Sequence, residues 1–448
     1  MLTALLHANI AAGENTSFLG VLCMPGTLHR TLVAGAASLA VVLSFAFTLD
    51  ASAQQTVKIG VLYPLSGNAA SAGTHAKIAS ELGADLINNG DPELGKLMPL
   101  AKGGGLPGLK GAKIELVTAD NQGSPQAGAN QTLRLITQEK VVAMIGSYQS
   151  GITQTASAVA EKYGIPFLTP ESTAGDLTER GFKWFFRTTP VSVNFAEAYA
   201  SFLKEQKAAG RKIDSIALVF ENTDYGKSTT DAIASQFGKD GLNVAMKVPY
   251  SANSTDVQPQ VLQLKEKNPD VVIFVSYTSD AILYAKTMKE LGWKPSIMMA
   301  DDAGFNDPAF VKAMGAQVEG LVSRSAFAEG KPGSIPTLVD ALYKKKSGGD
   351  GLDDGSARGL QGFLALADAI NRAGSTEPEK IRQALIATNM PADQMVAGYN
   401  GVKFDAKGQN ILGSSLVIQM RGGQYVPIWP KVKATADVVL PYKGWTAN

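Results

Sequence analysis

A run of 30 residues, from Val141 to Pro170, carries the clearest structural signal of this chain. It reads Val141-Val-Ala-Met-Ile-Gly146, then Ser147-Tyr-Gln-Ser150-Gly151, a helical pattern of small residues, and finally Gly164-Ile-Pro-Phe-Leu-Thr-Pro170. This order predicts a buried strand, a short Ser/Gly loop, a helix and a second apolar strand. The free N–H groups of the helix start and the loop hydroxyls would lie beyond the strand end, where an anionic or polar ligand group binds well.

Strand patterns alternate with helix patterns through most of the chain. Expected strands lie at residues 57–63, 112–118, 141–146, 213–220, 242–248, 271–276 and 296–300. Between these strands lie segments whose apolar residues have helical spacing, for example 74–88, 125–138 and 152–163. Strands that are apolar on both faces and joined by helices form parallel sheets covered on both sides, so the sequence predicts an α/β fold.

Two α/β units are expected from the length of the chain and from its pattern. We place crossings between the units near residues 186–190, 319–323 and 413–417. Lobe 1 then holds residues 54–188 and 322–415, and lobe 2 holds residues 189–321 and 416–448.

The first 53 residues are interpreted as an upstream extension followed by a signal peptide. From Met24 the chain passes through His29-Arg30 and an apolar stretch at 32–49 to Ala51-Ser-Ala53, which predicts cleavage between Ala53 and Gln54. The alternative is a membrane anchor that stays attached. A mis-set start codon, with Met24 rather than Met1 as the true start, is the favoured explanation for residues 1–23.

Composition excludes several kinds of chemistry. Cleavage would remove the single cysteine, Cys23, and leave His75 as the one histidine, so we expect no thiol nucleophile, no His/Cys metal site and no cofactor. His75 follows Gly73-Thr74 at an expected helix start, which predicts a surface or capping role. The chain has 41 Lys+Arg against 40 Asp+Glu and no basic stretch, which argues against nucleic acid as a partner.

Two sequence motifs resemble nucleotide-binding motifs of enzymes, but the residues around them do not fit such sites. Gly103-Gly-Gly105-Leu-Pro-Gly108 spells a dinucleotide motif but precedes a strand instead of following one. Tyr225-Gly-Lys-Ser228 has Glu221 where a phosphate loop needs its first glycine. Paired carboxylates at Asp301-Asp302 leave carboxylate chemistry open, but adjacency alone makes no acid/base pair. The sequence therefore favours binding over catalysis.

Several further motifs follow one another in a specific order and spacing. They are Lys58-Ile-Gly-Val-Leu-Tyr-Pro-Leu-Ser-Gly67, Asp120-Asn-Gln122, Gly146-Ser-Tyr-Gln-Ser150, Thr178-Glu-Arg-Gly181 before Phe186-Arg-Thr188, and Asp224-Tyr-Gly226. With these motifs, residues 57–442 resemble the periplasmic leucine/isoleucine/valine-type binding proteins of ABC transporters. The resemblance implies a type I periplasmic binding protein fold, in which two Rossmann-like lobes with parallel sheets are joined by three crossover strands and close around a ligand.

The same resemblance implies a function. It predicts a periplasmic, monomeric solute-binding component of an ABC importer, which binds an amino acid or a related carboxylated solute and delivers it to a permease at the inner membrane. An alternative is a ligand-sensing subunit of the same fold that signals to a regulatory partner.

Site residues are carried over from the family one by one. Ser150 and Thr173, with the N–H groups of Gly151 and Thr173, would hold a ligand carboxylate. Tyr225 and Tyr277 would cover the ligand from lobe 2, and Asp302 would meet an ammonium group, since a buried ammonium needs a counter-charge. The structural alternatives are a helix cap for Ser150, a turn for Thr173, core packing for the tyrosines, and a solvated acid or helix cap for Asp302.

This chain also departs from the family pattern. Ala72 stands where branched-chain members place an aromatic residue, which predicts a wider cleft. Glu171 replaces a small residue, and Ser172 beside it could share the role of Thr173. An added acid favours a larger or more polar ligand, including one with a second basic group.

Overall fold

The computed structural model describes residues 56–445, apart from the side chain of Ala316. The predicted extension and signal peptide at residues 1–53 lie outside the described residues. Within 56–445, no helix combines the length and the apolar character that crossing a membrane requires.

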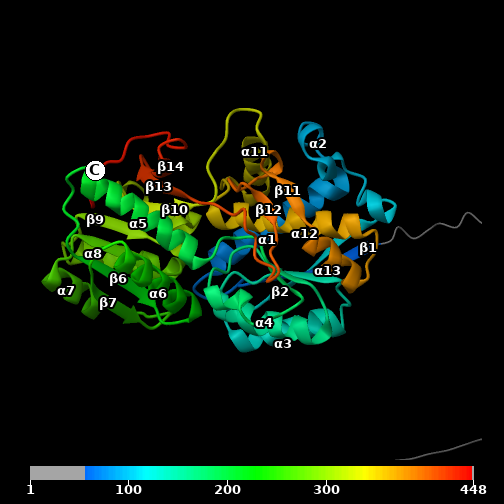
Figure 1. Ribbon diagram of the computed structural model, residues 1–448, viewed down its shortest axis with the longest axis horizontal. Coiled ribbons are helices and arrows are strands. Elements are labelled where there is room, and N and C mark those ends of the chain that lie inside the picture. The colour runs from blue at the N-terminus through cyan, green and yellow to red at the C-terminus, as the bar shows by residue number, and fades with distance from the viewer. Residues whose placement is uncertain (1–55, 446–448) are drawn as a thin grey trace, which may run out of the picture. The chain divides into compact units, whose positions relative to one another are not determined.

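Lobe 1 is built on a sheet of five parallel strands. Their spatial order is β2 (Lys113–Asp120), β1 (Thr56–Tyr63), β3 (Ala143–Gly146), β4 (Phe167–Thr169) and β5 (Phe185–Arg187). Helices α1 (Ala70–Asn89) and α12 (Asp354–Ala373) cover one face, and α3 (Pro125–Thr137) and α4 (Ser150–Tyr163) cover the other (Figure 1). Ile145 packs on the α1/α12 side and Met144 on the α3/α4 side, so alternate strand residues are buried on opposite faces.

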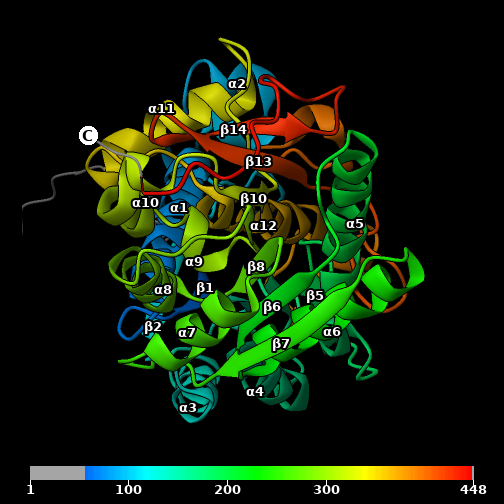
Figure 2. The ribbon, with the colours of Figure 1, turned by 90° about the vertical axis from the view of Figure 1, so that its left-hand side faces the viewer.

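Lobe 2 is built on a seven-stranded sheet. Its order is β14 (Gln424–Trp429), β13 (Leu416–Arg421), β10 (Val322–Ser325), β9 (Ile297–Ala300), β8 (Val271–Val275), β6 (Ile216–Glu221) and β7 (Val244–Tyr250). Figure 2 shows this sheet between α5 (Ser192–Ala208) and α6 (Asp224–Lys239) on one side and α7 (Gln258–Lys267) and α8 (Thr278–Glu290) on the other. This sheet is mixed: β6 to β10 run parallel, and β13 and β14 extend it as an antiparallel hairpin around Gly422-Gly423.

The remaining elements are short or lie beside the sheets. They are α2 (Leu94–Leu97), α9 (Ala303–Asn306), α10 (Pro308–Met314), α11 (Ile335–Ser347), α13 (Pro378–Ile386), β11 (Asn389–Pro391) and β12 (Gly401–Lys403).

The second crossing between the lobes lies later than the sequence predicts. We expected lobe 1 to resume at residue 322, but β10 pairs with β9 and β13 in the lobe 2 sheet, so the chain leaves lobe 2 after Ser325. β10 reads Val322-Ser-Arg-Ser325 and has one apolar residue, so no apolar strand pattern marks it as part of the lobe 2 sheet.

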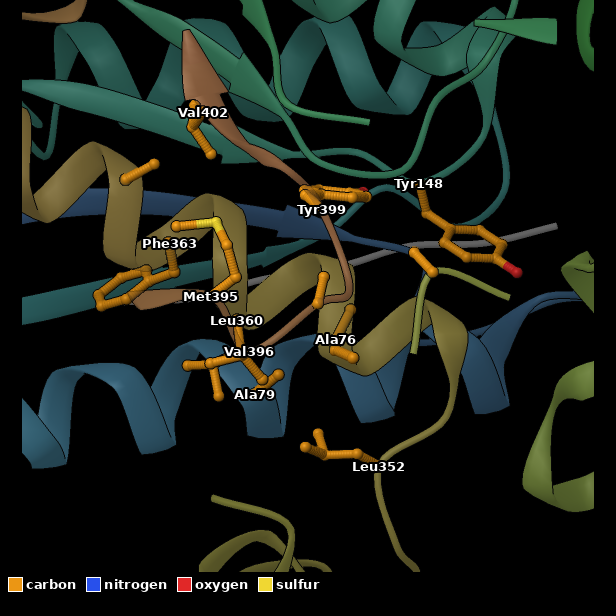
Figure 3. Packing of buried hydrophobic residues seen from close by; sticks show 14 of the residues in the cluster. Ala76, Ala79, Tyr148, Leu352, Leu360, Phe363, Met395, Val396, Tyr399 and Val402 are labelled. Atoms are coloured by element: carbon orange, nitrogen blue, oxygen red, sulfur yellow. The ribbon is translucent and has the colours of Figure 1, made fainter. Parts of the chain in front are cut away.

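Helices α1 and α12 pack closely against each other in lobe 1. Figure 3 shows Ala76 and Ala79 of α1 together with Leu360 and Phe363 of α12 in one buried cluster. Gly83 permits this approach, because a Cβ added there would overlap the ring of Phe363. Small residues on α1 thus allow α12 to pack closely against it.

Replacing Gly83 with alanine is expected to destabilise the protein by about 1–3 kcal/mol, since the added methyl forces the two helices apart. Gly238 of α6 is a matched control, because within the described residues nothing lies within 4 Å of a Cβ built there. Gly238→Ala should be neutral or stabilising by about 0.5 kcal/mol. Urea denaturation measures both, and equal effects at the two positions would contradict the packing described here.

Candidate ligand-binding site

A small cavity lies where strands of both lobes end. It is lined by Tyr148, Ser150, Glu171, Thr173, Tyr225, Tyr277, Asp302, Ala303, Arg324 and Arg358. Tyr148 and Ser150 follow β3, Glu171 and Thr173 follow β4, and Tyr277 and Asp302 follow β8 and β9. Ligands of doubly wound α/β folds bind at this edge of the sheet, beyond the carboxyl ends of the strands.

Six of the eight residues predicted from sequence line this cavity: Ser150, Glu171, Thr173, Tyr225, Tyr277 and Asp302. Gly151 and Ser172 lie beside it. The Ser172 hydroxyl is 2.6 Å from Thr153 Oγ1 and donates to the carbonyl oxygen of Tyr148, so it supports the loop instead of facing the cavity. Ala72, where the sequence predicts a wider cleft, is buried within α1 and is not among the lining residues.

Hydrogen-bond donors gather on the lobe 1 wall. Ser150 is the first residue of α4, and its Oγ accepts from the backbone N–H of Ala174 at 3.3 Å. Thr173 Oγ1 is buried and has no hydrogen-bond partner among the described residues. The free Thr173 hydroxyl lies in the loop that contacts Ser150 at the N-terminus of α4, and such a helix start is suited to an anionic group.

Aromatic rings from both lobes form a second wall. The ring centroids of Tyr148 in lobe 1 and Tyr277 in lobe 2 are 6.1 Å apart, and those of Tyr225 and Tyr277 are 5.2 Å apart. The Tyr225 hydroxyl donates to the backbone oxygen of Asp301 at 2.6 Å, which fixes the orientation of its ring. Tyr148 and Asp302 both have positive φ, 74° and 52°, a strained backbone that is often found at binding sites.

Two buried arginines bind the acidic groups behind the cavity. Arg358 Nη2 lies 2.6 Å from Asp302 Oδ2 and joins lobe 1 to lobe 2, and Arg358 Nε lies 2.7 Å from Asp354 Oδ2. Arg324 pairs with Asp301 at 2.8 Å and with Asp302 at 3.3 Å. Three carboxyl groups therefore surround two guanidinium groups, and the Asp302 carboxylate already has two positive neighbours.

The pKa values of Asp302 and Asp354, two carboxyl groups of this cluster, shift in opposite directions. Burial raises the pKa of Asp302, and the neighbouring Asp354 acts in the same direction. Burial also acts to raise the pKa of Asp354, but Arg358 and Arg324 outweigh it and hold that pKa below its usual range.

Contacts between the lobes surround the cavity. Ser71 Oγ donates to Asp307 Oδ1 at 2.6 Å, and the N–H of Gly175 donates to Ser228 Oγ at 3.0 Å. The N–H of Ser279 donates to the carbonyl oxygen of Asn68 at 3.3 Å. Since both lobes supply the walls, a bound molecule would touch both.

The family model described as periplasmic binding protein matches residues 56–424 of this chain. The chain belongs to the periplasmic binding protein family. Leu/Ile/Val-binding protein homolog 7 of Brucella abortus is 31% identical over 401 residues, which cover 87% of this chain and 96% of that protein. Homolog 8 of Brucella suis is 32% identical over 422 residues, which cover 92% and 98%.

Solved structures of similar fold include substrate-binding proteins of ABC transporters. LivJ from Streptococcus pneumoniae, in complex with isoleucine, is 23% identical in sequence and has a TM-score of 0.69. The match covers 86% of this chain and 100% of the LivJ chain. A solute-binding protein from R. palustris, in complex with benzoate, has a TM-score of 0.70 at 18% identity and covers 87% and 99%. The chain is thus a periplasmic binding protein of the leucine/isoleucine/valine type, with the type I fold.

Glu171 is the most unusual group in the site of this binding protein. The side chain is buried, and Tyr63 donates to its Oε1 at 3.0 Å. Gly359 of α12 leaves the space for it, since a Cβ there would lie 3.0 Å from Oε1. Burial raises the pKa of Glu171 to about 8, an effect that Arg358 and the Tyr63 hydrogen bond only partly oppose.

A larger hollow lies away from the strand-end cavity. It lies between α10, α11 and the β13–β14 hairpin. Two of its acidic side chains are paired, Asp350 with Lys312 at 2.7 Å and Asp340 with Lys344 at 2.6 Å. Among the described residues, no buried donor without a partner lines this hollow, so the smaller cavity is the better candidate despite its size.

His75 lies near this hollow, and its position differs from the one predicted from the sequence. The residue is buried within α1, and its Nδ1 is 2.9 Å from the Tyr343 hydroxyl. The predicted surface or capping role is wrong, because α1 begins at Ala70, earlier than the sequence indicated, and places His75 against α11.

Proposed function

We propose that this periplasmic binding protein is the solute-binding component of an ABC importer. It takes up an amino acid or a related small carboxylated solute in the strand-end cavity, as a monomer in the periplasm, and delivers it to a permease at the inner membrane. The observation that carries the proposal is the buried Thr173 hydroxyl, which lines this cavity beside Ser150 without a partner among the described residues. Relatives named for leucine, isoleucine and valine binding support the ligand class.

The ligand carboxylate binds first to lobe 1 in this mechanism. Ser150, Thr173 and the N–H groups at the start of α4 receive it, since several fixed donors favour an anion. Closure then brings Tyr225 and Tyr277 of lobe 2 over the ligand and excludes water. The closed state is favoured by contacts that only the two lobes together provide.

Removing the Thr173 hydroxyl should weaken binding with little change in stability. Thr173→Val is expected to raise Kd by about 10–100-fold, because a hydrogen bond to a charged group contributes roughly 1.5–3 kcal/mol. Thr230 of α6 is a matched control, since its buried hydroxyl also has no partner among the described residues and does not line the cavity. Isothermal titration calorimetry measures both variants, and an equal loss for Thr230→Val would contradict the assigned role.

A thermal-shift screen tests the proposed function. Amino acids, amides, small peptides, aromatic acids and polyamines are each added in excess to the purified mature protein. A ligand at about 1,000 times its Kd stabilises by about 4 kcal/mol, which moves the unfolding midpoint by several degrees. We expect hits among carboxylated solutes, and hits confined to compounds without a carboxylate would overturn the assignment.

A further inference from the structure

The α10–α11 hollow, as we call the larger hollow between α10, α11 and the β13–β14 hairpin, has walls from both lobes. Figure 2 shows these elements in the upper part of the view. Among the described residues that line it, five are acidic and two are lysines, and the acids are Glu329, Asp340, Asp350, Asp353 and Asp354. A recess lined mainly by one sign of charge attracts the opposite sign, so this hollow favours a positively charged occupant.

Two of these acids have no ion-pair partner within residues 56–445. Asp340 pairs with Lys344, Asp350 with Lys312, and Asp354 with Arg358. Asp353 and Glu329 form no ion pair with any described residue, although Glu329 acts on Lys344 over a longer distance. The Oδ1 atom of Asp353 accepts from the N–H of Ser356 and caps α12, which leaves its Oδ2 for another donor.

Asn306 independently indicates a missing donor. It lines the hollow and is only 6% exposed. Its Nδ2 donates to Asp302 Oδ1 at 3.2 Å and to the carbonyl oxygen of Arg324 at 2.5 Å, and neither of these residues lines the hollow. Its Oδ1, at the other end of the amide, is buried and has no hydrogen-bond partner in the described part of the chain. A buried acceptor without a partner is costly, so its place in the wall of a hollow points to a donor that arrives with a ligand.

Electrostatics place the unpaired acid near this amide. Asp307 follows Asn306 in the chain, and its pKa is raised to about 6, first by burial and then by Asp353. Asp353 precedes α12 in lobe 1 and Asn306 ends α9 in lobe 2, so the two acceptors belong to walls from different lobes.

Apolar side chains complete the lining and narrow the class of cation. They are Pro308, Val311, Phe327, Leu352, Ile418 and Pro427. Within the described residues, no three His, Cys, Asp or Glu side chains are placed to hold a metal ion together. An ammonium group on an alkyl chain fits this mixture, because the chain covers apolar surface while the ammonium donates up to three hydrogen bonds. Lys312 and Lys344 already pair with two of the acids in this way.

We propose that the α10–α11 hollow is a second ligand site, which binds an aliphatic ammonium compound. The ammonium group donates to Asp353, with Asn306 Oδ1 as a further acceptor and Glu329 as a second negative charge. The alkyl chain packs on apolar residues such as Val311 and Phe327. The site is separate from the strand-end cavity, and the inference does not depend on the proposed function.

Titration of the purified protein with matched probes tests the site. The compounds n-pentylamine and 1,5-diaminopentane carry ammonium groups on a five-carbon chain, and 1-pentanol has the same chain without a charge. Isothermal titration calorimetry at pH 7 is run in phosphate, since Tris is itself an amine. Both amines should bind saturably at one site per chain, and 1-pentanol should bind at least about tenfold more weakly, because hydrogen bonds between charged groups are lost.

Two substitutions locate the binding site of the amines. Asp353→Asn removes the charge and keeps the helix cap, since asparagine caps a helix as well as aspartate does. It should raise the Kd of the amines about tenfold. Glu329→Gln changes an exposed side chain and should raise the Kd about twofold to fivefold, because exposed charges contribute less. Glu290→Gln, at an exposed position that does not line the hollow, is the matched control and should leave the Kd unchanged.

Unfolding midpoints without ligand show whether each variant is folded, and Glu329→Gln keeps the test valid if Asp353→Asn is not. Equal affinity for 1-pentanol and n-pentylamine would overturn the second site, as would the absence of saturable amine binding. An unchanged Kd for the amines in every folded acid variant would also overturn it. None of these results bears on the proposed function, which the screen of carboxylated solutes tests separately.

Discussion

Arg358→Met is expected to destabilise the protein by about 3–5 kcal/mol, because it leaves three buried carboxyl groups to share the single guanidinium group of Arg324. Arg358 is buried, pairs with Asp302 and Asp354, and donates to the Thr189 hydroxyl at 3.0 Å. Asp354 would retain Arg324 only at 3.8 Å. Urea denaturation of wild type and variant measures the difference.

Arg134→Met is the matched control for this prediction. Arg134 of α3 pairs with Glu139 at 2.6 Å, and both side chains are about one-third exposed. Exposed pairs contribute at most about 1 kcal/mol, so its loss should be small. Adding Asp302→Asn to Arg358→Met should recover part of the stability, since the unpaired charge is removed. Equal destabilisation by the two arginine variants would show that the buried cluster contributes no more than a surface pair.

Glu171→Gln should become progressively more stable than the wild type as pH rises from 5 to 8. The folded protein holds the proton of Glu171 up to a pKa of about 8, against an ordinary value of 4.5. Between these values the unfolded chain loses the proton and the folded chain keeps it, so the wild type loses stability as pH rises through this range. The advantage of the variant should grow by about 3 kcal/mol between pH 5 and pH 8.

Denaturation curves without ligand at several pH values measure this difference. Glu290→Gln, the same substitution at an exposed position at the end of α8, serves as the control. A flat profile for Glu171→Gln would mean that Glu171 is ionised in the folded protein at neutral pH.

The fold could be predicted because its strands are apolar on both faces. The run around β3 and β4 shows this directly, since Ile145 and Met144 are buried on opposite sides of the sheet. The site residues at strand ends, such as Ser150 and Tyr277, could be predicted for a related reason. Parallel sheets bring the ends of separate strands to one edge, whatever their distance in sequence.

The arginines of the site could not be predicted in this way. Arg358 lies four residues after Asp354 within α12, a spacing that usually indicates a pair on an exposed helix face. Nothing in the sequence shows that this end of α12 packs into the space between the lobes. Arg324 lies inside β10, whose sheet we assigned wrongly, so its contact with Asp301 was also missed. Tyr148 stands within the quoted Gly146–Ser150 motif and could have been found from its place in that loop.

A crystal structure tests the binding site most directly. The protein is crystallised with an amino acid that raises its unfolding midpoint in the thermal-shift screen. The ligand should occupy the cavity between Tyr148 and Tyr277, with its carboxylate within hydrogen-bond distance of the Ser150 and Thr173 hydroxyls. Electron density for the ligand in the larger hollow beside Lys312 and Asp350, with the strand-end cavity empty, would contradict it.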